Sequence, residues 1–219
     1  MHAPELADLL TRDLARVLPP DYRVRKGAEF SEATREFPGG RVRIQLPFHG
    51  WPPRYTVNGV YVGIRFHAVQ TPIEEAQRRN DVFVEGLGDT IRDGAHQAAP
   101  DAPSFLHRDI TDPRSYAEVF ALIEQTLRQR TLPFIEQYSD LTCVHTRAME
   151  LPVQERARFL GPEVPLHLMA LKRLTGASDY ETYAGMVLAF AVEASRDNPR
   201  QYRNFDRVVA DLHEALRSV

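Results

Sequence analysis

The chain has 219 residues, of which 43% are hydrophobic and 26% are charged, and its formal net charge is −3. This composition excludes a fibrous or disordered protein, because it supplies enough apolar residues for a core. The slightly acidic balance argues against a dedicated nucleic-acid binder, although all but two of the 27 basic residues are arginine.

The N-terminus lacks a basic segment followed by an apolar run, and no stretch is long and apolar enough to span a bilayer. We therefore expect a cytoplasmic protein with no membrane association. The single cysteine, Cys143, excludes an internal disulfide and a thiolate metal cage.

The first predicted element is a helix over Pro4 to Leu18, which is closed by Pro19-Pro20. A short strand is expected over Tyr22 to Lys26. A polar segment then leads to the turn at Pro38-Gly39-Gly40.

Two runs with alternating apolar and polar residues follow, Arg41 to His49 and Val60 to His67. Because side chains alternate faces along a strand, each run predicts a strand with one buried face. The expected core residues are Val42, Ile44, Val60, Val62, Ile64 and Phe66, whereas Arg43 and Arg65 should point away from the core. The intervening residues 49–53 are too few for a crossover, so we expect antiparallel pairing.

Asn58-Gly59 leaves two possibilities open. The pair could form a hairpin turn between two short strands, or a bulge within one long strand from Arg54 to Phe66. The apolar residues change here from odd to even positions, from Tyr55 and Val57 to Val60 and Val62. A bulge produces this change without reversing the chain, so the bulge is favoured.

Thr71-Pro72 predicts the start of a helix that runs to about Val84. The residues from Gly86 to Ser104 are expected to form a long surface loop, and Phe105 to Ile110 an edge strand. Asp112-Pro113 marks the start of a further amphipathic helix.

The remaining chain is predicted to be almost entirely helical. Helices are expected over Leu132 to Tyr138, Pro152 to Leu160, Pro165 to Leu174, a segment that begins with a capping box at Ser178 and Glu181, and a terminal segment from Pro199. The helix after Ser178 has apolar residues on more than one side, which predicts burial on several sides.

These elements predict an α+β fold, with an antiparallel sheet that has helices packed on one face, followed by an all-helical C-terminal extension. The expected division is an α+β domain over 1–145 and a helical subdomain over 146–219.

The polar side of the two strands is the best candidate for a binding surface. It combines arginines, which match carboxylate and phosphate geometry, with aromatic residues that often anchor interfaces. The candidate binding residues are Arg41, Arg43, His49, Trp51, Tyr61, Arg65 and His67. The competing interpretation is an ordinary solvated face, or one that the C-terminal helices cover.

No motif predicts catalysis, a cofactor or a metal. His49, His67 and His107 lack a carboxylate or cysteine at a ligand spacing, and Gly86-Leu87-Gly88 lacks the further glycine of a dinucleotide-binding loop. We therefore expect no catalytic residues, no cofactor and no metal ligands.

The order of elements carries a resemblance over the first two-thirds of the chain. The helix, the strands, the Tyr55-Thr56-Val57-Asn58-Gly59-Val60 segment, the Phe105 to Ile110 segment and the helix before Leu132-Pro133-Phe134 resemble a group of uncharacterised bacterial α+β domains of unknown function. Some members of that group are regarded as immunity or accessory proteins. The C-terminal helices depart from the group, and no functional residue carries over from it.

The leading hypothesis is a non-enzymatic, immunity-like interaction protein that binds a partner protein rather than nucleic acid. The alternative is a small-molecule-binding domain or a hydrolase that uses the polar face with His49, Arg65 and His67. A pocket that gathers these three residues would favour the alternative, and a flat face would favour the partner. The sequence predicts no oligomeric state.

Overall fold

A computed structural model describes residues 2–82 and 88–218, which form two compact units. The first, here called the sheet unit, comprises residues 1–64 and 93–137, and the second, the helical unit, comprises residues 65–92 and 138–219. The division expected from the sequence was 1–145 and 146–219. The contacts instead group residues 65–92 with the C-terminal helices.

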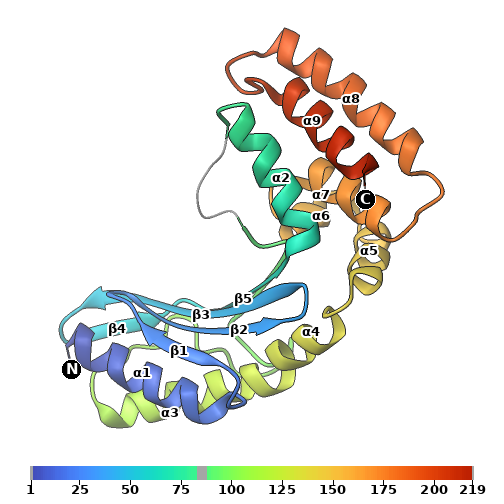
Figure 1. Ribbon diagram of the computed structural model, residues 1–219. Coiled ribbons are helices and arrows are strands. Elements are labelled where there is room, and N and C mark those ends of the chain that lie inside the picture. The colour runs from blue at the N-terminus through green and yellow to red at the C-terminus, as the bar shows by residue number, and fades with distance from the viewer. Residues whose placement is uncertain (1, 83–87, 219) are drawn as a thin grey trace. The chain divides into compact units, whose positions relative to one another are not determined.

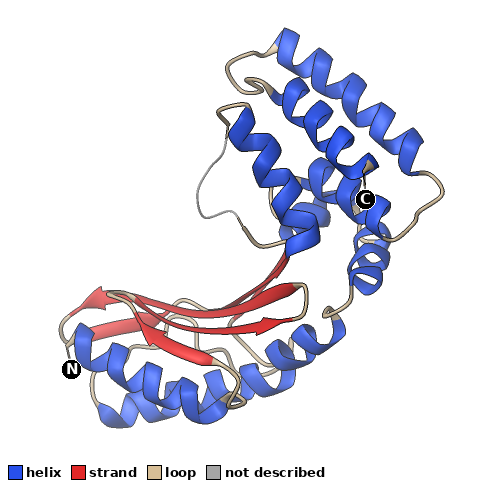
Figure 2. Ribbon diagram, viewed as in Figure 1, coloured by secondary structure: helices blue, strands red, loops and turns tan. Residues whose placement is uncertain are grey.

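The predicted α+β fold class is confirmed, with a six-stranded antiparallel sheet in the N-terminal half and an all-helical C-terminal region (Figures 1 and 2). The strand order is β1-β2-β3-β5-β6, and β4 also pairs with β3. The strands are β1 Arg23–Lys26, β2 Phe30–Phe37, β3 Gly40–Trp51, β4 Arg54–Val57, β5 Val60–Phe66 and β6 Ile91–Ala95.

The alternation of apolar and polar residues along β3 and β5 gives each strand the buried face that the sequence predicted. All six expected core residues are buried, with at most 5% of any of them exposed: Val42, Ile44, Val60, Val62, Ile64 and Phe66. A shift of one residue in either strand would turn these side chains toward solvent, so the apolar pattern fixes the register.

Asn58 and Gly59 interrupt the sheet without reversing the chain. The backbone N–H of Asn58 donates to the carbonyl of Pro47 (2.9 Å), and β4 and β5 both lie beside β3. The hairpin alternative is wrong, since β4 pairs with β3 rather than with β5. The favoured single strand is divided here into β4 and β5, but the parity shift is confirmed because Tyr55, Val57, Val60 and Val62 are all buried.

Three segments differ from their predicted structure. The polar segment before Pro38 contains β2, which pairs with both β1 and β3. The expected loop after Gly86 contains β6. The expected edge strand over 105–110 is wrong: it contributes a single bridge between Ile110 and Tyr55, while Phe105 is fully buried. Phe105 therefore owes its burial to tertiary packing and not to a place in a β-ladder.

Two helices of the sheet unit cover the same face of the sheet, α1 (Ala3–Val17) and α3 (Pro113–Thr126) (Figure 1). Asp112 caps α3 as predicted, because its carboxylate accepts from the backbone N–H groups of Arg114 and Ser115. A π-helical turn, η1 (Leu127–Thr131), connects α3 to α4 (Leu132–Gln137).

A buried hydrogen bond joins α1 to α3. The Tyr116 hydroxyl donates to Oδ2 of Asp13 (2.7 Å). Burial alone would raise the pKa of Asp13, but the hydrogen bonds from Arg12 and Tyr116 outweigh burial and hold that pKa below its ordinary value. The two helices are thus linked by a carboxylate that stays ionised.

The helical unit is built from six helices of the described chain. They are α2 (His67–Arg79), α5 (Leu141–Glu150), α6 (Val153–Leu160), α7 (Val164–Leu174), α8 (Tyr180–Asp197) and α9 (Phe205–Arg217). The predicted stops after α6 and α7 are confirmed, since Gly161 and Gly176 have φ of 78° and 68°, values that favour glycine.

Helix α2 begins four residues before the predicted start at Thr71. Pro72 lies inside the helix, where it removes one backbone hydrogen bond. Val69 and Gln70, which precede the Thr-Pro pair, are buried in a helix that contacts α7, and this packing extends α2 toward β5. The local start signal was therefore overridden by tertiary contacts. The predicted end near Val84 lies outside the described residues, and α2 ends earlier, at Arg79.

The fully surrounded helix is α7 and not α8. Every residue from Leu166 to Lys172 is buried, and α7 contacts α2, α5, α6, α8 and α9. The prediction that α8 is buried on several sides is wrong, because Met186, Phe190 and Val192 are exposed. The predicted capping box at Ser178 is also wrong: Asp179 is the N-cap residue, and its carboxylate accepts from Lys172.

Among residues 2–82 and 88–218, no helix has both the length and the apolar character needed to cross a membrane.

Candidate functional site

The seven candidate binding residues are divided between the two units. Arg41, Arg43, His49, Trp51 and Tyr61 belong to the sheet unit, whereas Arg65 and His67 belong to the helical unit. Five of the candidate residues therefore lie on the sheet unit, and the other two are considered separately.

The arginines of β3 lie on a face of mixed charge. The register places Arg41 opposite Glu36 and Arg43 opposite Thr34. Glu32, on the same face, accepts hydrogen bonds from Arg25 (2.8 Å) and Gln45 (3.3 Å). Carboxylates on β2 thus balance the cations, and this part of the surface is not the purely cationic platform that the residues of β3 and β5 suggested.

The end of the β3–β4 hairpin is the most exposed part of the candidate surface. We call His49, Trp51, Pro52, Pro53 and Arg54 the hairpin tip. Each is exposed, and the Trp51 side chain, at 85%, is the most exposed large hydrophobic residue among those that the structure describes. The predicted antiparallel pairing is confirmed here, since Trp51 lies opposite Arg54.

Local packing holds the hairpin tip in place. Gly50 has a φ of 140°, and a Cβ there would lie 2.3 Å from the Arg54 carbonyl oxygen, so only glycine fits. Behind the tip, Phe48 packs edge-on against Tyr55 with 6.4 Å between ring centroids, and Tyr55 also forms the bridge to Ile110. The exposed indole is consequently presented by a well-supported backbone.

Polar contacts at the hairpin tip are few and weak in geometry. His49 Nδ1 and Thr56 Oγ1 are 3.4 Å apart, and Arg54 Nε lies 3.9 Å from Asp109 Oδ2. Such exposed contacts contribute little to stability. The side chains of the hairpin tip can therefore exchange these weak contacts for contacts with another molecule at little cost in stability.

Tyr61 on β5 is partly exposed, at 46%, and its ring lies against backbone. A Cβ at either Gly59 or Gly94 would come within 3.1 Å of this ring. Both glycines thus allow the ring to lie flat on the sheet. Beside it, Arg130 forms a bidentate ion pair with Asp93 (3.1 and 3.2 Å), two residues that the sequence did not single out.

Arg65 is not the open cation that the strand pattern suggested. Its guanidinium donates twice to Glu74 on α2 (2.5 and 3.1 Å) and once to the Gly88 carbonyl (3.0 Å). Both side chains of the ion pair are only 15% exposed. Arg65 therefore connects β5 to the helix that follows it and has little capacity for a ligand.

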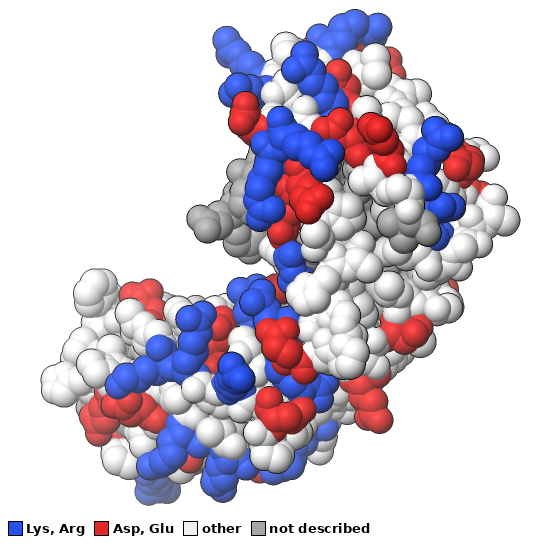
Figure 3. All heavy atoms as spheres, viewed as in Figure 1, with Lys and Arg blue, Asp and Glu red and all other residues white. Residues whose placement is uncertain are grey.

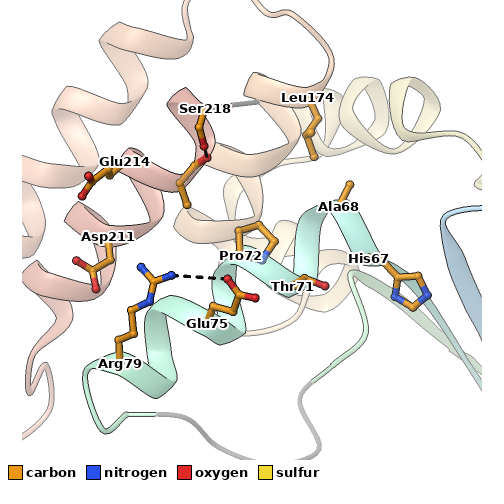
Figure 4. Close-up of a pocket in the computed structure, with 11 residues that line it drawn as sticks. His67, Ala68, Thr71, Pro72, Glu75, Arg79, Leu174, Asp211, Glu214 and Ser218 are labelled. Atoms are coloured by element: carbon orange, nitrogen blue, oxygen red, sulfur yellow. Dashed lines mark hydrogen bonds and ion pairs between the residues drawn. The ribbon is translucent and has the colours of Figure 1, made fainter.

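His67 is the first residue of α2 rather than a strand residue, and it lines a shallow groove between α2 and α9 (Figure 4). The groove has a volume of about 590 Å³. Arg79 extends toward Glu75 on α2 (3.8 Å), and Asp211 and Glu214 project from α9. Neither His49 nor Arg65 lines it, so the groove does not bring together the three residues of the hydrolase alternative.

A buried polar seam between α2 and α7 was missed at the sequence level. Gln70 is hydrogen-bonded to His167 Nε2 on α7, and Gln77 donates to Glu163, the N-cap residue of α7. Burial lowers the pKa of His167 to about 4 and raises the pKa of Glu163. The pairs Gln70/Gln77 and Glu163/His167 have helical spacing, but only the docking of the two helices brings them together.

No group of three or more histidine, cysteine, aspartate or glutamate side chains in the described parts of the chain could hold a metal ion. Cys143 is exposed on α5.

Metal content is a direct prediction from the sequence. Because the histidines lack ligand spacing and Cys143 has no second thiol, we expect the purified protein to carry no stoichiometric zinc or iron. Elemental analysis after dialysis measures this. One metal ion per chain that is lost when His49 or His67 is replaced by alanine would contradict the prediction.

No known family model, curated protein or solved structure matches this chain.

Proposed function

We propose that this chain is a non-enzymatic interaction protein, of the immunity or accessory kind, that binds a partner protein through the hairpin tip. The observation that carries the proposal is the exposure of Trp51 on a hairpin that is paired to its end and supported by the Phe48–Tyr55 packing. Tryptophan is among the residues most often responsible for binding energy, and a preorganised loop loses little entropy on association.

The chemistry of the tip indicates the kind of surface it would meet. The indole and the two prolines provide apolar area, and His49 and Arg54 flank them with polar and cationic groups. An apolar pocket with carboxylates at its rim would complement both features. The expected compartment is the cytoplasm.

Replacing Trp51 with alanine should weaken partner binding by about thirtyfold or more while leaving the fold intact. An exposed side chain contributes roughly 0.5 kcal/mol or less to stability, whereas loss of a central anchor weakens binding by about 2 kcal/mol or more. Affinity enrichment from native cells with the wild-type and variant proteins, followed by titration calorimetry with the enriched protein, measures the difference.

Val153→Ala is the matched control, because Val153 is also exposed (71%) but lies on α6. It should leave binding unchanged. Trp51 is the single tryptophan of the chain, so intrinsic fluorescence reports on the tip alone. Partner binding should shift its emission to shorter wavelength and protect it from quenching. Equal enrichment by wild type and Trp51→Ala would refute the proposed role of the tip.

A small-molecule-binding function is the second candidate, and the groove between α2 and α9 is the observation that favours it. Its volume lies within the range of ligand sites, and its lining combines apolar residues with four charged side chains, Glu75, Arg79, Asp211 and Glu214. Thermal-shift screening of wild type and Ala215→Trp, which would fill the groove, tests this function: a ligand that stabilises only the wild type would support it.

A further inference from the structure

Helix α8 has apolar side chains on every side, but its own chain covers only one. Its buried residues, among them Ala184, Val187 and Ala191, lie on the side that packs on α7 and α9. On the opposite side, Met186 and Val192 are each 58% exposed. Around the helix axis, the positions of Gly185 and Ala189 fall between those two side chains. A helix that is apolar all round is normally buried all round, so this face has the character of an interface.

The exposed face is arranged symmetrically about Ala189. Met186 precedes Ala189 by three residues and Val192 follows it by three, while Gly185 and Glu193 are four residues away on either side. In an antiparallel pair of α8 helices centred on Ala189, Val192 of one copy lies within one residue rise, about 1.5 Å, of the level of Gly185 of the other. A Cβ at Gly185 would meet nothing within 4 Å, so this position leaves open space for the valine.

The ends of α8 carry charged groups that an antiparallel pair would bring together. The N-terminal end presents Asp179 and Glu181, which are 60% and 71% exposed and contact Lys172 and His213 within the chain. At the C-terminal end Arg196 is hydrogen-bonded to Asp197 (2.8 Å), and Arg200 and Arg203 follow in the loop before α9. Figure 3 shows basic side chains gathered at the top of the view, over the end where α8 passes into that loop. An antiparallel pair would place Glu181 of each copy close to the level of Arg196 of the other.

From the spacing of the exposed residues about Ala189 and the facing of Glu181 and Arg196 we infer that α8 is a self-association surface, on which a second copy of this chain docks in an antiparallel, two-fold arrangement centred on Ala189. The occupant is a second copy because in such a pair Val192 of each copy faces the open space at Gly185 of the other, and Arg196 of each faces Glu181 of the other, as an isologous interface requires. One helix pair buries less area than a typical permanent interface, so the dimer forms reversibly with concentration.

The first experiment measures mass against concentration by sedimentation velocity. The wild type is expected to shift from monomer to dimer as concentration rises. Ala189→Arg places two guanidinium groups at the centre of the pair and should weaken association by at least about tenfold, equivalent to about 1.4 kcal/mol. Val153→Arg changes an equally accessible apolar residue on α6 and should associate like the wild type.

The second experiment tests the register. Cys143 is replaced by serine, and cysteine is then introduced at Ala189 or, as the control, at Val153. The two-fold arrangement brings both copies of residue 189 together, so mild oxidation should yield a disulfide-linked dimer from the Ala189→Cys protein but not from the Val153→Cys protein. Circular dichroism confirms that each variant is folded.

The third experiment tests the charges. Glu181→Lys and Arg196→Glu should each weaken the dimer, and the double variant should restore it, because reversing both charges recreates opposite charges across the pair. A wild type that stays monomeric at all concentrations would overturn the inference, as would a dimer that Ala189→Arg leaves intact or whose Ala189→Cys form does not cross-link. A monomeric wild type whose Ala189→Arg variant loses another protein partner would assign the face to that partner instead.

Discussion

Replacing Arg65 with glutamate is expected to destabilise the helical unit by about 3–5 kcal/mol, the usual cost of leaving a buried charge without its partner. Arg65 and Glu74 are each 15% exposed and are joined by two hydrogen bonds. The substitution places two carboxylates against each other there and leaves the Gly88 carbonyl without its donor. Urea denaturation followed by far-UV circular dichroism measures the loss.

Two further variants make this prediction specific. Arg79→Glu, also in the helical unit, changes an arginine that is 61% exposed and lies 3.8 Å from Glu75, so it should change stability by only about 0.5 kcal/mol or less. Combining Arg65→Glu with Glu74→Arg reverses the ion pair and should recover part of the loss. Equal stability of Arg65→Glu and wild type would mean that the ion pair contributes nothing to the fold.

Acidification from pH 6.5 to pH 4 is expected to cost roughly 3 kcal/mol of stability through His167 alone. Burial lowers the pKa of His167 to about 4 in the folded protein, against an ordinary value of 6.5 in the unfolded chain. Between these two values the unfolded chain binds a proton that the folded protein does not. The contribution of neutral His167 to the free energy of unfolding is therefore fully present above pH 6.5, falls as the pH decreases, and levels off below about pH 4.

His167→Gln isolates this contribution, because glutamine can bond to Gln70 but does not titrate. The variant should lose less stability than the wild type between pH 6.5 and 4, and the difference between the two denaturation curves gives the effect. Burial also lowers the pKa of His145, which is why a variant of His167 is needed rather than the total slope. If the stability of the wild type and of His167→Gln fell equally between pH 6.5 and 4, His167 would bind its proton as readily in the folded protein as in the unfolded chain, and the prediction would be wrong.

The strand faces could be predicted because the evidence for them is local. A two-residue alternation of apolar side chains identifies a buried face whatever the strand pairs with, so Val42, Ile44, Val62 and Ile64 were assigned correctly. The same holds for the start of α3, since Asp112 and Pro113 act within one helical turn. Segments with mixed polarity, such as β2 and β6, carry no such pattern, and their strands form because β3 and β5 provide edges to pair with.

For the candidate site, the sequence identified residue types, but it did not determine their partners. The prediction that residues 49–53 connect two antiparallel strands needed only the strand pattern and the short spacing. The ion pair between Arg65 and Glu74 forms because α2 begins at His67. The sequence did not predict this, since Thr71-Pro72 indicated a later helix start. The seam of Gln70, Gln77, Glu163 and His167 joins segments more than 80 residues apart, and no local spacing predicts such a meeting.

The sequence by itself determined the α+β class, the two buried strand faces and several helix ends, because periodicity, proline and glycine act over a few residues. The terminal helix expected from Pro199 begins only at Phe205. Only the tertiary structure decided which helix is central. Helix α8 has the more apolar outer side, yet α7 is the buried one, and it accommodates His167 and Lys172 through Gln70 and Asp179. Burial depends on which surfaces meet in three dimensions, so a polar side chain with a partner can lie in the core while Met186 and Val192 face outward.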